Sequence, residues 1–266
     1  PVPSARPVVR GPAAEVAPAS ERWIVRSTGA ARSHELRVEA LLISRVDSVE
    51  RTDTLQSIAR TTWTYSAVPS AARVPARIAG TLTAFAASVG ERSLETPVGP
   101  SLPLTYAAEQ SSPAEQPQFT LPRADDCGPS SAAVALVREL WVTPPETLSV
   151  GREWTDSAQF MTCRDSIPIT VTSTRTFRVL GAERRSEGAL VLIERRSSTR
   201  MSGSGTQFGE PLEITAEGEG TMLIALAVDG GAIVSGSGEA ELRMEMRGRR
   251  RTQQLVQRAR IVLAAR

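Results

Sequence analysis

The sequence contains no lysine and no asparagine, and His34 is its only histidine. Schiff-base chemistry on a lysine side chain is therefore excluded. A metal site built from several histidines is excluded as well, and a Ser-His-Asp or Cys-His catalytic group would have to use His34. The arginine-only basic set fits a GC-rich genome, because Lys and Asn codons begin with AA.

Aromatic residues make up only 4% of the 266 residues, so few side chains can stack on nucleic-acid bases. No run of roughly 18 to 20 apolar residues is present, so we expect no transmembrane segment. The chain begins at Pro1 and not at Met, which favours removal of a signal peptide. We therefore expect a membrane-associated protein of the periplasm or cell envelope, with a lipid anchor conceivable at a residue preceding Pro1.

The chain has only two cysteines, Cys127 and Cys163. In an exported protein this pair predicts a disulfide, which contributes about 2 to 4 kcal/mol by closing a loop. The alternative is two unpaired buried thiols in a cytosolic protein. A redox-active pair is typically Cys-x-x-Cys, and this spacing differs from that pattern.

The net charge of +2 conceals two oppositely charged regions. Residues 91–170 carry 11 acidic and 5 Arg side chains, whereas residues 239–266 carry 3 acidic and 8 Arg side chains. This asymmetry suits orientation on a charged partner or membrane surface, although a solvated strand face explains it equally well.

Alternating apolar and polar residues are abundant, and they predict a mainly β protein with curved antiparallel sheets, half-barrel or sandwich-like. We expect a Pro-rich tether (1–20), an N-terminal β unit (21–110), a connector (111–147) and a C-terminal antiparallel β unit (148–266). The similar strand runs make a duplicated β unit one interpretation. Strands are expected at 23–27, 34–46, 54–68, 76–89, 148–162, 167–180, 188–202, 211–228, 231–247 and 251–264.

One short helix is predicted around residues 130–142, from a Ser cap, an Ala-rich segment and the Pro144-Pro145 stop. Asp229-Gly230-Gly231 predicts a tight hairpin turn. Three Gly-x-Gly pairs superficially resemble phosphate loops, but each lies in or beside a strand and lacks a following helix. We expect these glycines to relieve crowding where the sheet bends. They are Gly203/Gly205, Gly218/Gly220 and Gly236/Gly238.

The densest basic patch is Arg247, Arg249, Arg250 and Arg251. Anionic lipid headgroups or an acidic protein are its candidate partners, and a solvated turn is the simpler interpretation. Nucleic acid is not expected, because no aromatic residue follows Phe208. The acidic pairs Asp125-Asp126 and Glu239/Glu241 have the character of solvated carboxylates, so no catalytic, cofactor or metal site is predicted.

The order Val150-Gly151-x-x-Trp154, a strand, Cys163 and Pro168-x-Thr-Val-Thr resembles uncharacterised exported β-proteins of GC-rich Gram-negative bacteria. More distantly, it is similar to the LolA-like lipoprotein carriers and LppX-like lipoproteins. This resemblance covers mainly residues 120–264. It implies an antiparallel sheet wrapped around an apolar cavity and carries no functional residues across.

We expect a non-enzymatic structural or binding subunit on the periplasmic face of a membrane protein complex. An energy-converting complex, such as a photosynthetic reaction centre with its antenna, is one conceivable host. The alternative is a carrier of lipid or another apolar ligand. Its cavity would be lined by Met222, Ile224, Leu226, Leu242, Met244 and Met246.

Overall fold

A computed structural model describes most of the strand-forming part of the chain. The described residues are 15–16, 21–25, 31–65, 77–94, 102–109, 118–119, 144–145, 147–164, 167–185, 188–207, 209–249 and 251–266. The predicted helix at 130–142, Cys127, the Asp125-Asp126 pair and Arg250 lie outside them. Two residues of the predicted tether, Glu15 and Val16, are described and pair with residues 183–184.

The described residues form antiparallel sheets, which confirms the expected mainly β fold with curved antiparallel sheets. The strands are β1 (Glu15–Val16), β2 (Arg22–Ile24), β3 (Ala31–Val46), β4 (Val49–Tyr65), β5 (Arg77–Val89), β6 (Arg92–Leu94), β7 (Leu102–Glu109), β8 (Gln118–Phe119), β9 (Thr147–Ser149), β10 (Glu153–Arg164), β11 (Ile167–Arg185), β12 (Gly188–Gln207), β13 (Glu210–Ala227), β14 (Ile233–Gly248) and β15 (Thr252–Ala265).

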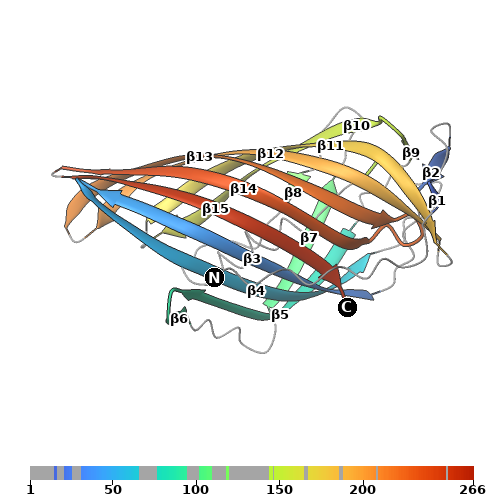
Figure 1. Cartoon of the computed structure of the whole chain (residues 1–266), viewed down its shortest axis with the longest axis horizontal. Coiled ribbons are helices and arrows are strands. Elements are labelled where there is room, and N and C mark those ends of the chain that lie inside the picture. Colours follow the sequence, from blue (N-terminus) through green and yellow to red (C-terminus); the bar gives the residue numbers. More distant parts are fainter. Residues whose placement is uncertain are drawn as a thin grey trace.

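One 13-stranded sheet has the order β1-β11-β12-β13-β14-β15-β3-β4-β5-β7-β8, with β10 also on β11 and β6 also on β5. Its long strands run side by side along the molecule, and β7 and β8 pass behind them (Figure 1). Within the part of the chain that the structure describes, the terminal strands β1 and β8 do not pair with each other, so the sheet is open. Because β15 pairs with β3, both strand-rich regions of the sequence share this sheet.

Two strand predictions need correction. The 23–27 segment was expected in the main N-terminal sheet, but β2 pairs with β9 in a separate two-stranded sheet. The strand expected at 148–162 is interrupted by a turn at Gly151, whose φ of 79° separates β9 from β10. A backbone with this positive φ is disfavoured for residues with a side chain, which explains the glycine.

Side chains alternate between two faces of the main sheet. The inner face carries the apolar core, and the outer face is mostly polar. On β11, Val171 and Phe177 are buried, whereas Thr172, Thr174 and Thr176 between them are exposed. The core forms two clusters, one around Phe177, Ile193 and Ile224 and the other around Ile169, Ile214 and Met244.

Glycines shape the sheet where the sequence predicts a turn and crowding. Gly230 and Gly231 have φ of 102° and 64°, which confirms the tight turn between β13 and β14. A side chain at Gly203 would place its Cβ 2.4 Å from the Pro168 carbonyl oxygen. At Gly238 the corresponding distance to the Thr221 carbonyl oxygen is 2.2 Å. These contacts support the predicted role of the Gly-x-Gly pairs in relieving crowding.

Candidate functional site: a groove across the outer face

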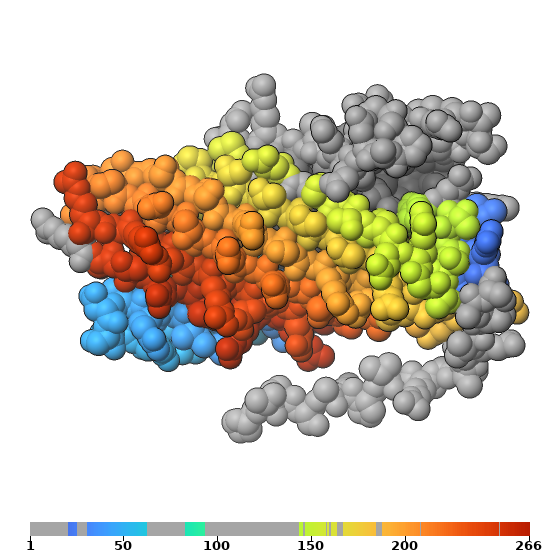
Figure 2. Space-filling model, turned by 90° about the horizontal axis from the view of Figure 1, so that it is seen from above, coloured from blue at the N-terminus to red at the C-terminus, as the bar shows by residue number. Residues whose placement is uncertain are grey.

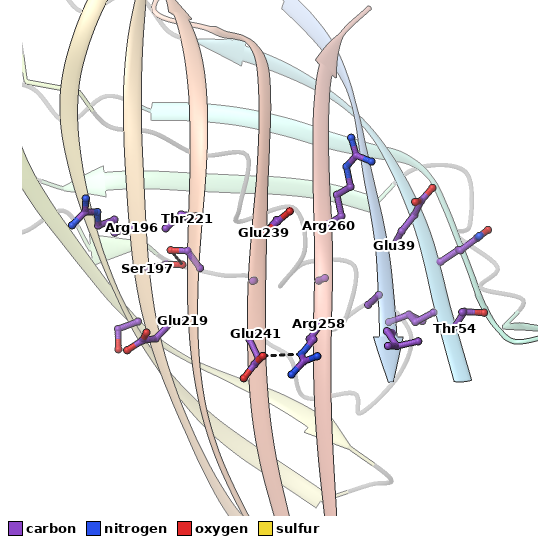
Figure 3. Close-up of a pocket in the computed structure, with 18 of the residues that line it drawn as sticks. Glu39, Thr54, Arg196, Ser197, Glu219, Thr221, Glu239, Glu241, Arg258 and Arg260 are labelled. Carbon is purple, nitrogen blue, oxygen red and sulfur yellow. Dashed lines mark hydrogen bonds and ion pairs between the residues drawn. The ribbon is translucent and has the colours of Figure 1, made fainter. Parts of the chain in front are cut away.

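A groove of about 930 Å³ crosses the outer face of the sheet from β11 to β4. Two rows of side chains line it, and strand register aligns each row across seven strands (Figure 3). The first row is Thr176, Arg196, Thr221, Glu239, Arg260, Glu39 and Gln56. The second row is Thr174, Ser198, Glu219, Glu241, Arg258, Leu41 and Thr54. We call this site the outer groove.

The floor of the outer groove is formed by residues that lie between the two rows and are small. Between the two rows lie Ser197, Gly220, Ala240, Ala259 and Ala40, which are register neighbours on consecutive strands. Gly220 has no side chain, and the side chains of the other four point to the inner face because alternate residues of a strand face opposite ways. These strands also form one continuous surface in the space-filling view (Figure 2).

Part of the charge in the outer groove is neutralised internally. Glu241 accepts hydrogen bonds from Arg243, with Nη2 at 2.7 Å from its Oε1, and from Arg258, with Nε at 2.9 Å from its Oε2. The hydrogen bonds from Arg243 and then Arg258 lower the pKa of Glu241. The carboxylate of Glu241 is therefore ionised, and its two oxygens are already bound by arginines of the same sheet.

Three other carboxylates in the outer groove have no ion-pair partner among the described residues. They are Glu39, Glu219 and Glu239, and all three are exposed. Glu219 lies directly opposite Glu241 in the β13–β14 pairing. Glu241 is compensated by two guanidinium groups, whereas Glu219 has no arginine within ion-pair distance among the described residues.

The predicted basic patch lies at the turn between β14 and β15, away from the outer groove. Arg247 forms an ion pair with Glu245, whereas Arg249 and Arg251 have no ion pair within the described part of the chain. Arg247 and Arg249 line a second hollow of about 660 Å³ with hydroxyl groups of β12 and β13. Their binding to lipid headgroups or an acidic protein stays a prediction.

The predicted disulfide can be followed at one of its two cysteines. Cys163 is half-buried on β10 and has no free thiol, but its pairing with Cys127 stays a prediction because Cys127 is not described. Glu239 and Glu241 share the outer face of β14, as expected. Within the described residues, no three His, Cys, Asp or Glu side chains are placed to hold a metal ion.

The residues of the predicted apolar cavity face the inner side of β13 and β14. Met222, Ile224 and Leu226 belong to the first core cluster. Met244 and Met246 belong to the second, and Leu242 packs against it. These side chains line neither the outer groove nor the second hollow, so the carrier hypothesis stays a prediction.

His34 is a buried core histidine. It is 3% exposed, and its Nε2–H donates to the Ile233 carbonyl oxygen at 2.8 Å, while Nδ1 has no hydrogen-bond partner among the described residues. Burial lowers its pKa from the ordinary value. The next residue, Glu35, accepts hydrogen bonds from Arg60, Arg37 and Arg266, and those from Arg60 and Arg37 lower its pKa.

We expect the protein to lose stability as the pH falls below about 6.5. The unfolded chain protonates His34 there, whereas the folded chain resists protonation, so the loss reaches up to about 1.4 kcal/mol per pH unit. Denaturant unfolding at pH 7.5 and 5.5 measures this loss, and His34→Gln should reduce it. Equal losses in the wild type and the variant would contradict the assignment. Glu35 contributes separately, because its stabilisation is lost only when the pH falls below about 4.5.

Comparison with protein-family models, curated proteins and solved structures found no match to this chain. Among the described residues, no helix has the length and hydropathy of a membrane span. The fold and the site therefore define the protein as an open, curved antiparallel β-sheet with a charged groove across its outer face.

Proposed function

We propose that this chain is a non-enzymatic structural and binding subunit that docks through its outer face on the periplasmic side of a membrane protein complex. The outer groove carries the proposal. It crosses seven strands, and six spacings of about 4.8 Å make it about 29 Å long. An open groove of this length fits a segment of a macromolecule better than a small metabolite held in an enclosed pocket.

Exposed apolar side chains on the same face support docking. Leu41 belongs to the second row and is 38% exposed. Leu223 and Val262 lie in the next row of outward-facing residues beyond the first row, and both pair with Ser237. Leu223 is 45% exposed and Val262 is 38% exposed. Specific protein interfaces contain both apolar and polar contacts. On the outer face these apolar side chains lie within and beside the charged rows, so a partner would meet both kinds of contact.

Native-gel separation of solubilised membranes from the source organism tests the proposed function. We expect the chain, detected by immunoblot, to migrate with a larger assembly, because an extrinsic subunit stays attached through its docking face. An energy-converting complex, such as a reaction centre with its antenna, is one candidate for that assembly. Migration of the chain only as a free monomer would argue decisively against this function.

A further inference from the structure

We infer that the outer groove binds an extended, basic polypeptide segment of a partner protein. This inference rests on the proposed function and adds the chemistry of the partner. At about 3.3 Å per extended residue, a groove of about 29 Å holds roughly nine residues. The groove is open along its length, so a chain segment can lie in it without its ends being enclosed.

The unneutralised charge of the outer groove selects a basic occupant. Glu39, Glu219 and Glu239 have no arginine within ion-pair distance among the described residues. Of the arginines that line the groove, Arg260 alone has no carboxylate within ion-pair distance in this part of the chain. Arg260 lies in register between Glu239 and Glu39, and the lining residues together hold four Glu and three Arg, which leaves a net charge of −1. Arginine or lysine side chains of a partner would complement this negative charge.

The position of Glu219 strengthens this assignment. It lies directly opposite Glu241, and both guanidinium contacts of Glu241 come from other neighbours, Arg243 and Arg258, so Glu219 has none of its own among the described residues. A cation in the groove would give Glu219 the ion-pair partner that it lacks among the described residues.

The test uses a fluorescent ten-residue peptide of alternating Arg and Ser, with a Glu-Ser peptide as the charge-reversed probe. Fluorescence anisotropy measures binding to the full chain and to the groove variant Glu39→Gln/Glu219→Gln/Glu239→Gln. The control variant Asp47→Asn/Glu91→Gln/Asp229→Asn removes the same charge from exposed positions outside both the outer groove and the second hollow.

We expect the Arg-Ser peptide to bind the wild type and the control variant alike, and the groove variant about tenfold or more weakly. The unfolding midpoint of Glu219→Gln should equal or exceed that of the wild type, which separates lost binding from lost folding. Equal weakening in both triple variants would show general charge attraction and overturn the inference. Absent binding, or stronger binding of the Glu-Ser peptide, would overturn it as well.

Two further outcomes would also overturn the inference. A wild-type chain that dimerises, with the dimer lost in the groove variant, would assign the outer groove to a second copy and overturn the inference. A groove variant that still migrates with the larger assembly in native gels would also overturn it. In that last case the chain would still be a subunit of a larger assembly, but its docking through the outer groove would be ruled out.

Discussion

Asp156→Ala is expected to lower the free energy of unfolding by about 3 to 5 kcal/mol, because it leaves the Arg175 charge buried without its carboxylate. Both side chains lie on the inner face and are at most 1% exposed. Arg175 donates from Nε to Oδ1 at 2.7 Å and from Nη2 to Oδ2 at 2.5 Å. Its guanidinium also lies 5.4 Å from the centre of the Phe177 ring.

Denaturant unfolding at pH 7.5 measures this effect, and the double variant Asp156→Leu/Arg175→Met provides the control. Apolar replacement of a whole buried ion pair is often close to neutral, so the double variant should recover most of the lost stability. A loss below about 1 kcal/mol for Asp156→Ala would show that the pair is solvated and not buried.

Gly238→Ala is expected to destabilise the protein by about 1 to 3 kcal/mol, because its Cβ would collide with the backbone of β13. The new atom would lie 2.2 Å from the Thr221 carbonyl oxygen and 2.8 Å from the Met222 Cα. These are backbone and core atoms, so relief requires the two strands to separate.

Gly181→Ala is the matched control for Gly238→Ala. Nothing lies within 4 Å of a Cβ at Gly181, and its φ is not in the positive region. Replacing such a glycine is neutral or stabilises by up to about 1 kcal/mol through the unfolded chain. If the two alanine variants unfold at the same denaturant concentration, close strand approach at Gly238 is not what requires glycine there.

Strand positions followed from the sequence because alternation is a local property. The strands predicted at 34–46, 188–202 and 231–247 match β3, β12 and β14 closely, and the Gly230-Gly231 turn followed from backbone freedom. Pairing was not predictable in the same way. The β3–β15 and β2–β9 pairs join residues more than 120 positions apart, and periodicity does not specify which edges meet.

The candidate site illustrates the same limit. Glu239 and Glu241 were expected to be solvated carboxylates, and they are surface residues of the outer groove. The groove itself depends on register across seven strands, which brings Arg196, Arg260 and Glu39 into one row. No single segment of the sequence contains that information.

Asp156 and Arg175 were missed, although a signal for Arg175 is present. Arg175 occupies the same alternation phase as Val171, Phe177 and Val179, all of which are buried. A charged residue in an apolar phase predicts a buried charge that needs a partner. The identity of that partner, Asp156, depends on the β10–β11 register.

The most direct test of the outer face as the functional surface is native-gel separation with the wild type, the groove variant and the control variant side by side. We predict that the wild type and the control variant migrate with a larger assembly, and that the groove variant shifts to the monomer position. A wild-type chain found only as a free monomer would contradict the account.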